Sequence, residues 1–109
     1  MKIYLVALAM VKSVYALSRK VQQHDPDLAR QMRKSSSSVV LNMAEGWHAR
    51  GGNRIARFDT AMQEARETTS ALDVSAAVGF LTVAEVAVDL DRLDHIVATL
   101  WKLGGRRRK

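Results

Sequence analysis

The sequence predicts an all-α protein, folded as an antiparallel up-down-up-down four-helix bundle. Four stretches of the 109-residue chain repeat apolar side chains every three or four positions, as one face of a helix does. Short groups of Pro, Gly and polar turn residues separate these stretches, and such short connections make consecutive helices antiparallel. No stretch shows the alternation of apolar and polar residues that indicates a half-buried strand.

The first predicted helix covers about residues 3–23. Its expected core stripe recurs at steps of three or four residues and consists of Val6, Met10, Val14, Leu17 and Val21. A second apolar row consists of Leu5, Leu8, Val11 and Tyr15. Two rows are more apolar surface than one bundle core needs. At the following turn, Asp25 is expected to cap the next helix and Pro26 to occupy its first position.

The second and third predicted helices cover about residues 26–50 and 54–78. The expected core stripe of the second helix is Leu28, Met32, Ser35, Val39, Met43 and Trp47. The expected core stripe of the third helix is Ile55, Phe58, Met62, Ala65, Thr69, Leu72 and Ala76. Gly51 and Gly52 separate the two helices, and Asn53 is expected to cap the third.

The fourth predicted helix opens at the segment Thr82-Val83-Ala84-Glu85, which has the pattern of a capping box, after Gly79 has ended the third helix. Its expected core stripe is Val86, Leu90, Leu93, Val97 and Leu100, with Ile96 and Leu103 beside it. Two glycines at 104 and 105 end this helix. We therefore expect one bundle domain over residues 1–105 and a basic tail over residues 106–109.

The charge of the chain is unevenly distributed. Its formal net charge is +6 and its isoelectric point about 10.2. Residues 1–57 hold ten Lys and Arg against three acids, whereas residues 58–103 hold three against eight. The absence of cysteine excludes disulfides and thiolate chemistry. The apolar run that starts the chain is interrupted by Lys12 and is too short to span a bilayer, so we expect a cytoplasmic protein without membrane attachment.

Three polar residues share one face of the second predicted helix. Ser38, Asn42 and Glu45 are spaced by four and three positions, and apolar residues fill the positions between them. We expect Asn42 and Glu45 to tie this helix to a neighbour, with Arg66 as a candidate partner, because buried polar groups need partners. The alternative is that both line a shared pocket at a subunit boundary.

The segment 38–46, Ser-Val-Val-Leu-Asn-Met-Ala-Glu-Gly, resembles the Ser-Ile-Pro-x-Asn-Ile-Ala-Glu-Gly signature of a family of small bacterial four-helix bundles. These proteins were first noticed in intervening sequences of large-subunit (23S) ribosomal RNA genes. Other matching segments are Tyr15-Ala16-Leu17, Gln31-Met32-Arg33-Lys34, the set Ala61, Glu67 and Leu72, and Gly79-Phe80-Leu81. The chain departs from the pattern at Val40, where the family has proline, and at Gln63-Glu64, where it has Gly-Ser.

The resemblance implies a left-handed bundle that assembles as a ring-like homopentamer and has no established catalytic activity. It also implies a kinship to the accessory variability determinant proteins of diversity-generating retroelements, which are implicated in binding nucleic acid and a reverse transcriptase. From the residues alone we expect only a partner surface, since exposed apolar rows on a small domain mark one. The expected oligomer interface is Leu5, Leu8, Val11, Tyr15, Ile96, Trp101 and Leu103.

The sequence does not favour catalysis. Glu45 and His48 form one Glu-x-x-His pattern, but a di-metal bundle needs two such motifs and two further carboxylates. Ser38 and His48 are ten residues apart, about 15 Å along a helix, so they cannot act as nucleophile and base in one chain. We therefore predict a non-enzymatic protein without a metal site or cofactor.

The leading hypothesis is a scaffold that binds RNA or DNA nonspecifically through phosphate contacts. The candidate residues are Arg30, Arg33, Lys34, Arg50, Arg54, Arg57, Arg106, Arg107, Arg108 and Lys109. Few aromatic residues accompany them, so we expect little base-specific readout. The alternative is an adaptor whose basic surface binds an acidic protein, for example a reverse transcriptase, with no direct role toward nucleic acid.

Overall fold

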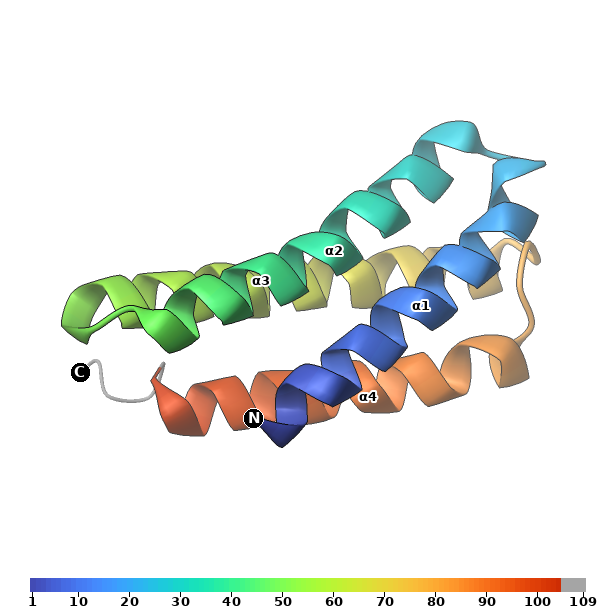
Figure 1. The fold of residues 1–109 in the computed structure, drawn as a ribbon. Helices are drawn as coiled ribbons and strands as arrows, with labels where there is room; N and C mark the ends of the chain where they lie inside the picture. Colours follow the sequence, from blue (N-terminus) through green and yellow to red (C-terminus); the bar gives the residue numbers. More distant parts are fainter. Residues whose placement is uncertain (105–109) are drawn as a thin grey trace.

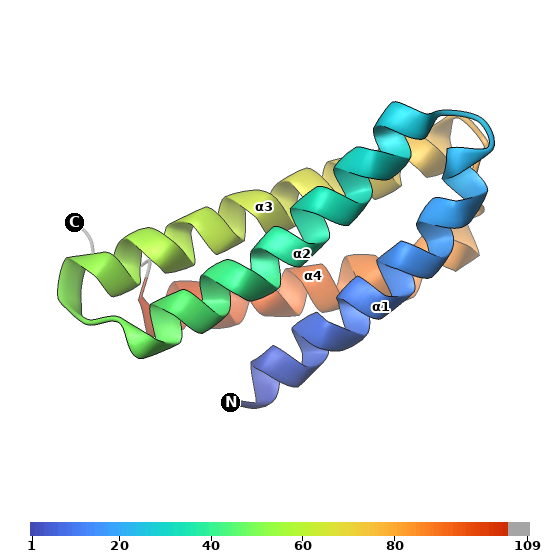
Figure 2. The ribbon, with the colours of Figure 1, turned by 45° about the horizontal axis from the view of Figure 1, so that its top comes forward.

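The computed structural model describes residues 1–104 of the chain as four helices (Figure 1). They are α1 (Lys2–Gln22), α2 (Pro26–His48), α3 (Gly51–Ala77) and α4 (Val83–Leu103). Helix α1 packs against α2 and α4, and α3 packs against the same two helices, so α1 and α3 lie diagonally across the bundle (Figure 2). This arrangement confirms the predicted four-helix bundle. The basic tail predicted at residues 106–109 lies outside the described residues.

The predicted caps at two of the turns are confirmed. The Asp25 carboxylate Oδ1 accepts a hydrogen bond from the Leu28 N–H at 3.0 Å, and Pro26 occupies the first turn of α2. The Thr82 hydroxyl accepts from the Glu85 N–H at 3.0 Å, while the Glu85 carboxylate accepts from the Thr82 N–H at 2.9 Å. Each cap satisfies backbone donors that the first turn of a helix leaves without partners.

The α2–α3 turn differs from its prediction. Helix α2 ends at His48 and α3 begins at Gly51, so Asn53 lies inside α3 and the predicted cap at Asn53 is wrong. The chain reverses through Gly51, whose φ of 54° lies in the left-handed region that glycine adopts without strain. Carbonyl oxygens in the last turn of α2 accept hydrogen bonds from α3, because the Arg54 guanidinium donates to the Gly46 and Trp47 carbonyls.

The core of α1 is rotated from the predicted stripe. Its buried residues are Ile3, Ala7, Met10, Val14, Ser18 and Val21, whereas Val6 and Leu17 are half-buried at the edges of the core. Small residues at 7 and 18 face the centre, where they permit close approach of the neighbouring helices. Val11, which we expected at an oligomer interface, packs partly buried against the core. Leu5, Leu8 and Tyr15 stay exposed.

Two large residues occupy environments opposite to the predicted ones. Ile96 was predicted on a surface row of the fourth helix, but it is fully buried in the core and is removed from the expected interface. Trp47 was predicted in the core stripe of the second helix, but it is 41% exposed. Consecutive residues of a helix point about 100° apart. A rotation of the helix by less than that angle about its axis can therefore turn one side chain into the core and its neighbour to the surface.

Gly46 of α2 packs closely against α3. A Cβ atom at Gly46 would lie 2.6 Å from two ring carbons of Phe58 on α3, inside van der Waals contact. A Cβ atom at Gly104 would lie 2.9 Å from the other edge of the same ring. Phe58 is fully buried between these two glycines. Gly46, the last residue of segment 38–46, therefore leaves the space that the Phe58 ring occupies at this end of the bundle.

Candidate nucleic-acid interface

The basic residues predicted to bind nucleic acid do not form one cluster. Arg30, Arg33 and Lys34 lie in the first turns of α2, near the α1–α2 turn. Arg50, Arg54 and Arg57 lie at the other end, around the α2–α3 turn. Lys34 and His48 are 14 residues apart on α2, which corresponds to about 21 Å along the helix axis. The predicted cluster is therefore divided into two groups at opposite ends of the bundle.

The group near the α1–α2 turn is partly engaged in structure. The Arg33 guanidinium on α2 donates to the Ser18 hydroxyl and to the Gln22 side-chain carbonyl on α1, each at 3.3 Å. Arg30 forms an exposed ion pair with Asp27 at 3.1 Å. Lys34 is exposed and forms no ion pair with another described residue. Arg33 thus holds two helices together, which leaves Lys34 as the most available cation of this group.

The second group forms a basic corner, which we define as Trp47, His48, Arg50, Arg54 and Arg57. Arg54 is fixed in place: its Nε donates to the Gly46 carbonyl at 3.1 Å and its Nη2 to the Trp47 carbonyl at 2.8 Å. Arg57 forms an ion pair with Glu45 at 3.4 Å, with both side chains about half exposed. Arg50 is exposed and forms no ion pair with another described residue. Of these three arginines, only Arg57 forms an ion pair with a carboxylate of the described residues.

Glu45 and Asn42 have different partners from those predicted. Glu45 pairs with Arg57 and not with Arg66, because the antiparallel arrangement places the start of α3 beside the end of α2. Asn42 is buried, but its amide donates to the Ser38 carbonyl at 2.9 Å and hydroxyl at 3.1 Å within the same helix. Within the described residues, Asn42 does not tie α2 to another helix. Glu67 is exposed on α3.

Asp89 of α4 is a buried carboxylate that was not predicted from the sequence. Asp89 is completely buried, accepts a hydrogen bond from the Ser13 hydroxyl of α1 and pairs with Arg92 at 2.9 Å. The position could have been found, because Asp89 lies three residues after Val86 and four before Leu93, on the core side of the helix. Its role is to join α1 to α4 with a satisfied charge.

A second link between α1 and α4 lies at the surface, where Lys20 forms an ion pair with Glu85. The hydrogen bond from Lys20, followed by that from the Thr82 backbone N–H, holds the pKa of Glu85 below its ordinary value of 4.5. A lowered carboxylate pKa stabilises the folded state above that ordinary value, and the contribution is lost as the pH falls through the folded-state pKa. Because Glu85 is exposed, the contribution is small.

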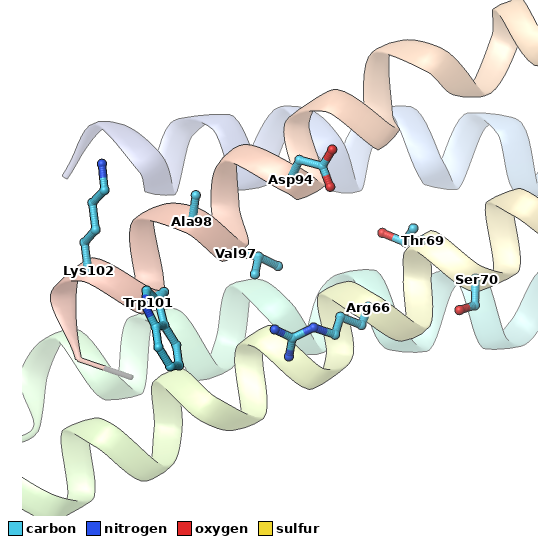
Figure 3. Close-up of a pocket in the computed structure, with 8 residues that line it drawn as sticks. All are labelled: Arg66, Thr69, Ser70, Asp94, Val97, Ala98, Trp101 and Lys102. Atoms are coloured by element: carbon cyan, nitrogen blue, oxygen red, sulfur yellow. The ribbon is translucent and has the colours of Figure 1, made fainter. Parts of the chain in front are cut away.

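An open groove of about 610 Å³ separates α3 from α4 (Figure 3). Its lining residues are Arg66, Thr69, Ser70, Asp94, Val97, Ala98, Trp101 and Lys102. Figure 3 shows Trp101 and Lys102 at one end of the groove, Thr69 and Ser70 at the other end, and Arg66 between them. Trp101 is 48% exposed, so much of its ring is left for a partner. We refer to this feature as the α3–α4 groove.

Residues 1–104 contain no group of three or more His, Asp or Glu side chains placed to hold a metal ion. In the same part of the chain, none of the four helices is long and apolar enough to cross a membrane. The fold and the basic corner define the class of the protein: a small, basic four-helix bundle.

The family follows from comparison with known proteins. The model of the 23S rRNA-intervening sequence protein family matches residues 1–102, and the chain therefore belongs to that family. A solved structure from Bacteroides thetaiotaomicron, described as a protein of unknown function from the S23 ribosomal protein family, has the same fold. Its TM-score is 0.84 at 17% identity, over 93% of this chain and 96% of that one. No curated protein gives a significant match.

Proposed function

We propose that this protein is a non-enzymatic, oligomeric scaffold that binds RNA or DNA through phosphate contacts, with little preference for sequence. The observation that carries the proposal is the basic corner, where Arg50, Arg54 and Arg57 lie within eight residues and, among the described residues, only Arg57 forms an ion pair, with Glu45. Arginine suits this role because its planar guanidinium can donate two parallel hydrogen bonds to a phosphate. The net charge of +6 adds a long-range attraction.

Oligomerisation would strengthen such binding, because each copy adds a basic corner and releases further counterions from the same nucleic acid. Two surfaces support assembly. Helix α1 has no acidic residue and leaves Leu5 66% and Leu8 42% exposed. In the α3–α4 groove, Val97 and Ala98 extend the apolar surface around Trp101. A contact between two different faces closes into a ring when the rotation allows. The family resemblance supplies the number five.

Light scattering tests the assembly. We expect a multiple of 12.1 kDa at micromolar concentration, and smaller species for Leu8→Glu or Trp101→Glu. Val88→Glu is a matched control, because Val88 is also an exposed apolar residue, 57% accessible, but lies outside both surfaces. A monomer of the natural sequence would overturn the oligomeric part of the proposal.

Filter binding across a series of salt concentrations tests the phosphate contacts. The double variant Arg50→Gln with Arg57→Gln should weaken binding to generic single and double strands. It should also reduce the slope of log affinity against log salt by about 1.4 for single strands and about 1.8 for duplex. The control, Arg19→Gln with Arg30→Gln, removes the same charge near the α1–α2 turn and should change the slope less. Absence of binding by the natural protein at low salt would overturn the proposal.

A protein-binding adaptor is the second candidate function. The observation that favours it is Leu41 on α2, which is 62% exposed between the two basic groups. An exposed apolar side chain of this size on a helix surface suits contact with a partner protein. Loss of a protein partner on Leu41→Glu, with unchanged binding to nucleic acid, would support this alternative.

A further inference from the structure

Two adjoining cavities lie beside the basic corner. The first has a volume of about 310 Å³ and is lined by Met1, Tyr4, Ala44, Trp47 and His48. The second has a volume of about 410 Å³ and is lined by Glu45, His48, Ala49, Asn53 and Arg57. His48 lines both cavities, so the cavity with the aromatic rings adjoins the cavity that contains the Glu45–Arg57 ion pair. The first volume is near the lower end of the range for ligand pockets, which suits a small planar group.

Trp47 supplies the largest ring of this site. Its ring is partly exposed, although burial of a tryptophan against the core would be more favourable. The Arg54 guanidinium lies over the ring at 5.6 Å from its centroid and is itself held by two backbone carbonyls of α2. This contact restrains the indole, and Arg54 lines neither cavity. The ring is therefore restrained by a fixed cation while it still borders an open cavity.

The combination of restrained rings and neighbouring cations distinguishes this end of the bundle from the other basic group. At the α1–α2 turn, near Arg30, Arg33 and Lys34, the rings of His24 and Phe80 stack on each other at 4.8 Å between centroids, and neither ring lines one of the cavities given above. At the basic corner, Tyr4 and Trp47 share a cavity, and Arg57 lines the next one. Proteins that bind single strands combine these two elements, because cations follow the phosphates while rings stack on the bases.

We propose that Trp47, with Tyr4 and His48, stacks on an unpaired base of single-stranded RNA or DNA, while Arg50 and Arg57 contact the flanking phosphates. This inference rests on the proposed function and adds a preference for single strands. Bases inside a duplex are covered on both faces by their neighbours, so the rings cannot reach them without unstacking. Stacking is tolerant of sequence, because every base has a π face.

Tryptophan fluorescence tests the stacking directly. The chain has two tryptophans, so Trp101→Phe leaves Trp47 as the sole indole. Titration of this variant with oligothymidylate of about 15 nucleotides should quench the Trp47 emission, as expected for a stacked base. A duplex of equal length should bind through phosphate contacts with little quenching. Equal quenching by both, or none by either despite binding, would overturn the stacking site.

Filter binding with the same two probes gives a second readout. Trp47→Ala should weaken binding to the single strand about 5- to 150-fold, the range for loss of one stacked base, and leave the duplex affinity unchanged. Trp47→Phe keeps a ring and should retain most of the single-strand affinity. Circular dichroism of both variants establishes that the helices are intact.

The two sets of variants also distinguish a failure of the stacking site from a failure of the proposed phosphate contacts. If Trp47→Ala binds both probes like the natural protein while Arg50→Gln with Arg57→Gln loses both, the phosphate contacts stand and the stacking site is wrong. If the natural protein binds neither probe at low salt, both proposals fail. A loss confined to the single strand on Trp47→Ala, reversed by Trp47→Phe, supports the site.

Discussion

The α2–α3 seam and the α3–α4 groove lie on two sides of the same helix, yet one is closed and the other open. In the seam, Gly46 meets the Phe58 ring, and the Ser35 and Thr68 hydroxyls share a buried hydrogen bond of 2.7 Å. In the groove, Trp101 is half exposed beside a hollow of about 610 Å³. Residue size accounts for the difference, because small residues let backbones approach while a tryptophan holds them apart.

This difference distinguishes residues that stabilise the fold from residues that leave surface for a partner. The residues of the seam satisfy one another inside a single copy of the chain, and their substitution should affect folding. The residues of the groove leave ring surface and charge without such contacts, and their substitution should mainly affect assembly. The same contrast applies within segment 38–46, where Gly46 packs in the seam while Glu45 forms an exposed ion pair.

Removal of the Phe58 ring should give the largest loss of stability. Phe58→Ala would empty the space between Gly46 and Gly104, and deletions of this size cost about 3–5 kcal/mol of unfolding free energy. Trp101→Ala removes a larger ring from the groove but should cost less, because about half of that ring is already in water. Urea unfolding at a fixed protein concentration measures both. Equal costs would show that the groove is packed like the seam.

Addition of one methyl group to the seam should have the next largest effect. Gly46→Ala places a Cβ 2.6 Å from Phe58, and overpacking of this kind costs about 1–3 kcal/mol. Gly52→Ala is the control: Gly52 lies in the first turn of α3, and nothing lies within 4 Å of the added Cβ. The control should be neutral or stabilising by up to about 1 kcal/mol. Similar denaturant midpoints for the two variants would contradict the close approach.

The buried hydrogen bond between Ser35 and Thr68 should give the smallest of the three effects. Thr68→Val leaves the Ser35 hydroxyl without its partner on α3, at a cost of about 1 kcal/mol. The cost is low in its range because, without Thr68, the Ser35 hydroxyl can still donate to the Met32 carbonyl of its own helix. Ser35→Ala with Thr68→Val should cost less than the sum of the single variants. Strict additivity in this cycle would show that the two hydroxyls are not coupled.

The fold could be predicted from the sequence because its determinants are local. The helical repeat and the caps at Asp25 and Thr82 each depend on residues within one or two turns. The α2–α3 turn was predicted less well, because α3 begins at Gly51, before Asn53, and its N-cap Arg50 makes no side-chain capping hydrogen bond. The candidate site was only partly predictable. Its arginines were predicted from the sequence, but their separation into groups at opposite ends of the bundle and the exposure of Trp47 were not.

By itself, the sequence determined that the chain forms four antiparallel helices, where the turns fall and which half is basic, since periodicity, caps and charge are properties of neighbouring residues. Only the tertiary structure decided which apolar row of each helix faces inward. An apolar stripe wider than about 100° permits several rotations of a helix, and the choice depends on what its neighbours present. That choice buried Ile96 and Asp89, exposed Trp47 beside Arg54, and paired Glu45 with Arg57.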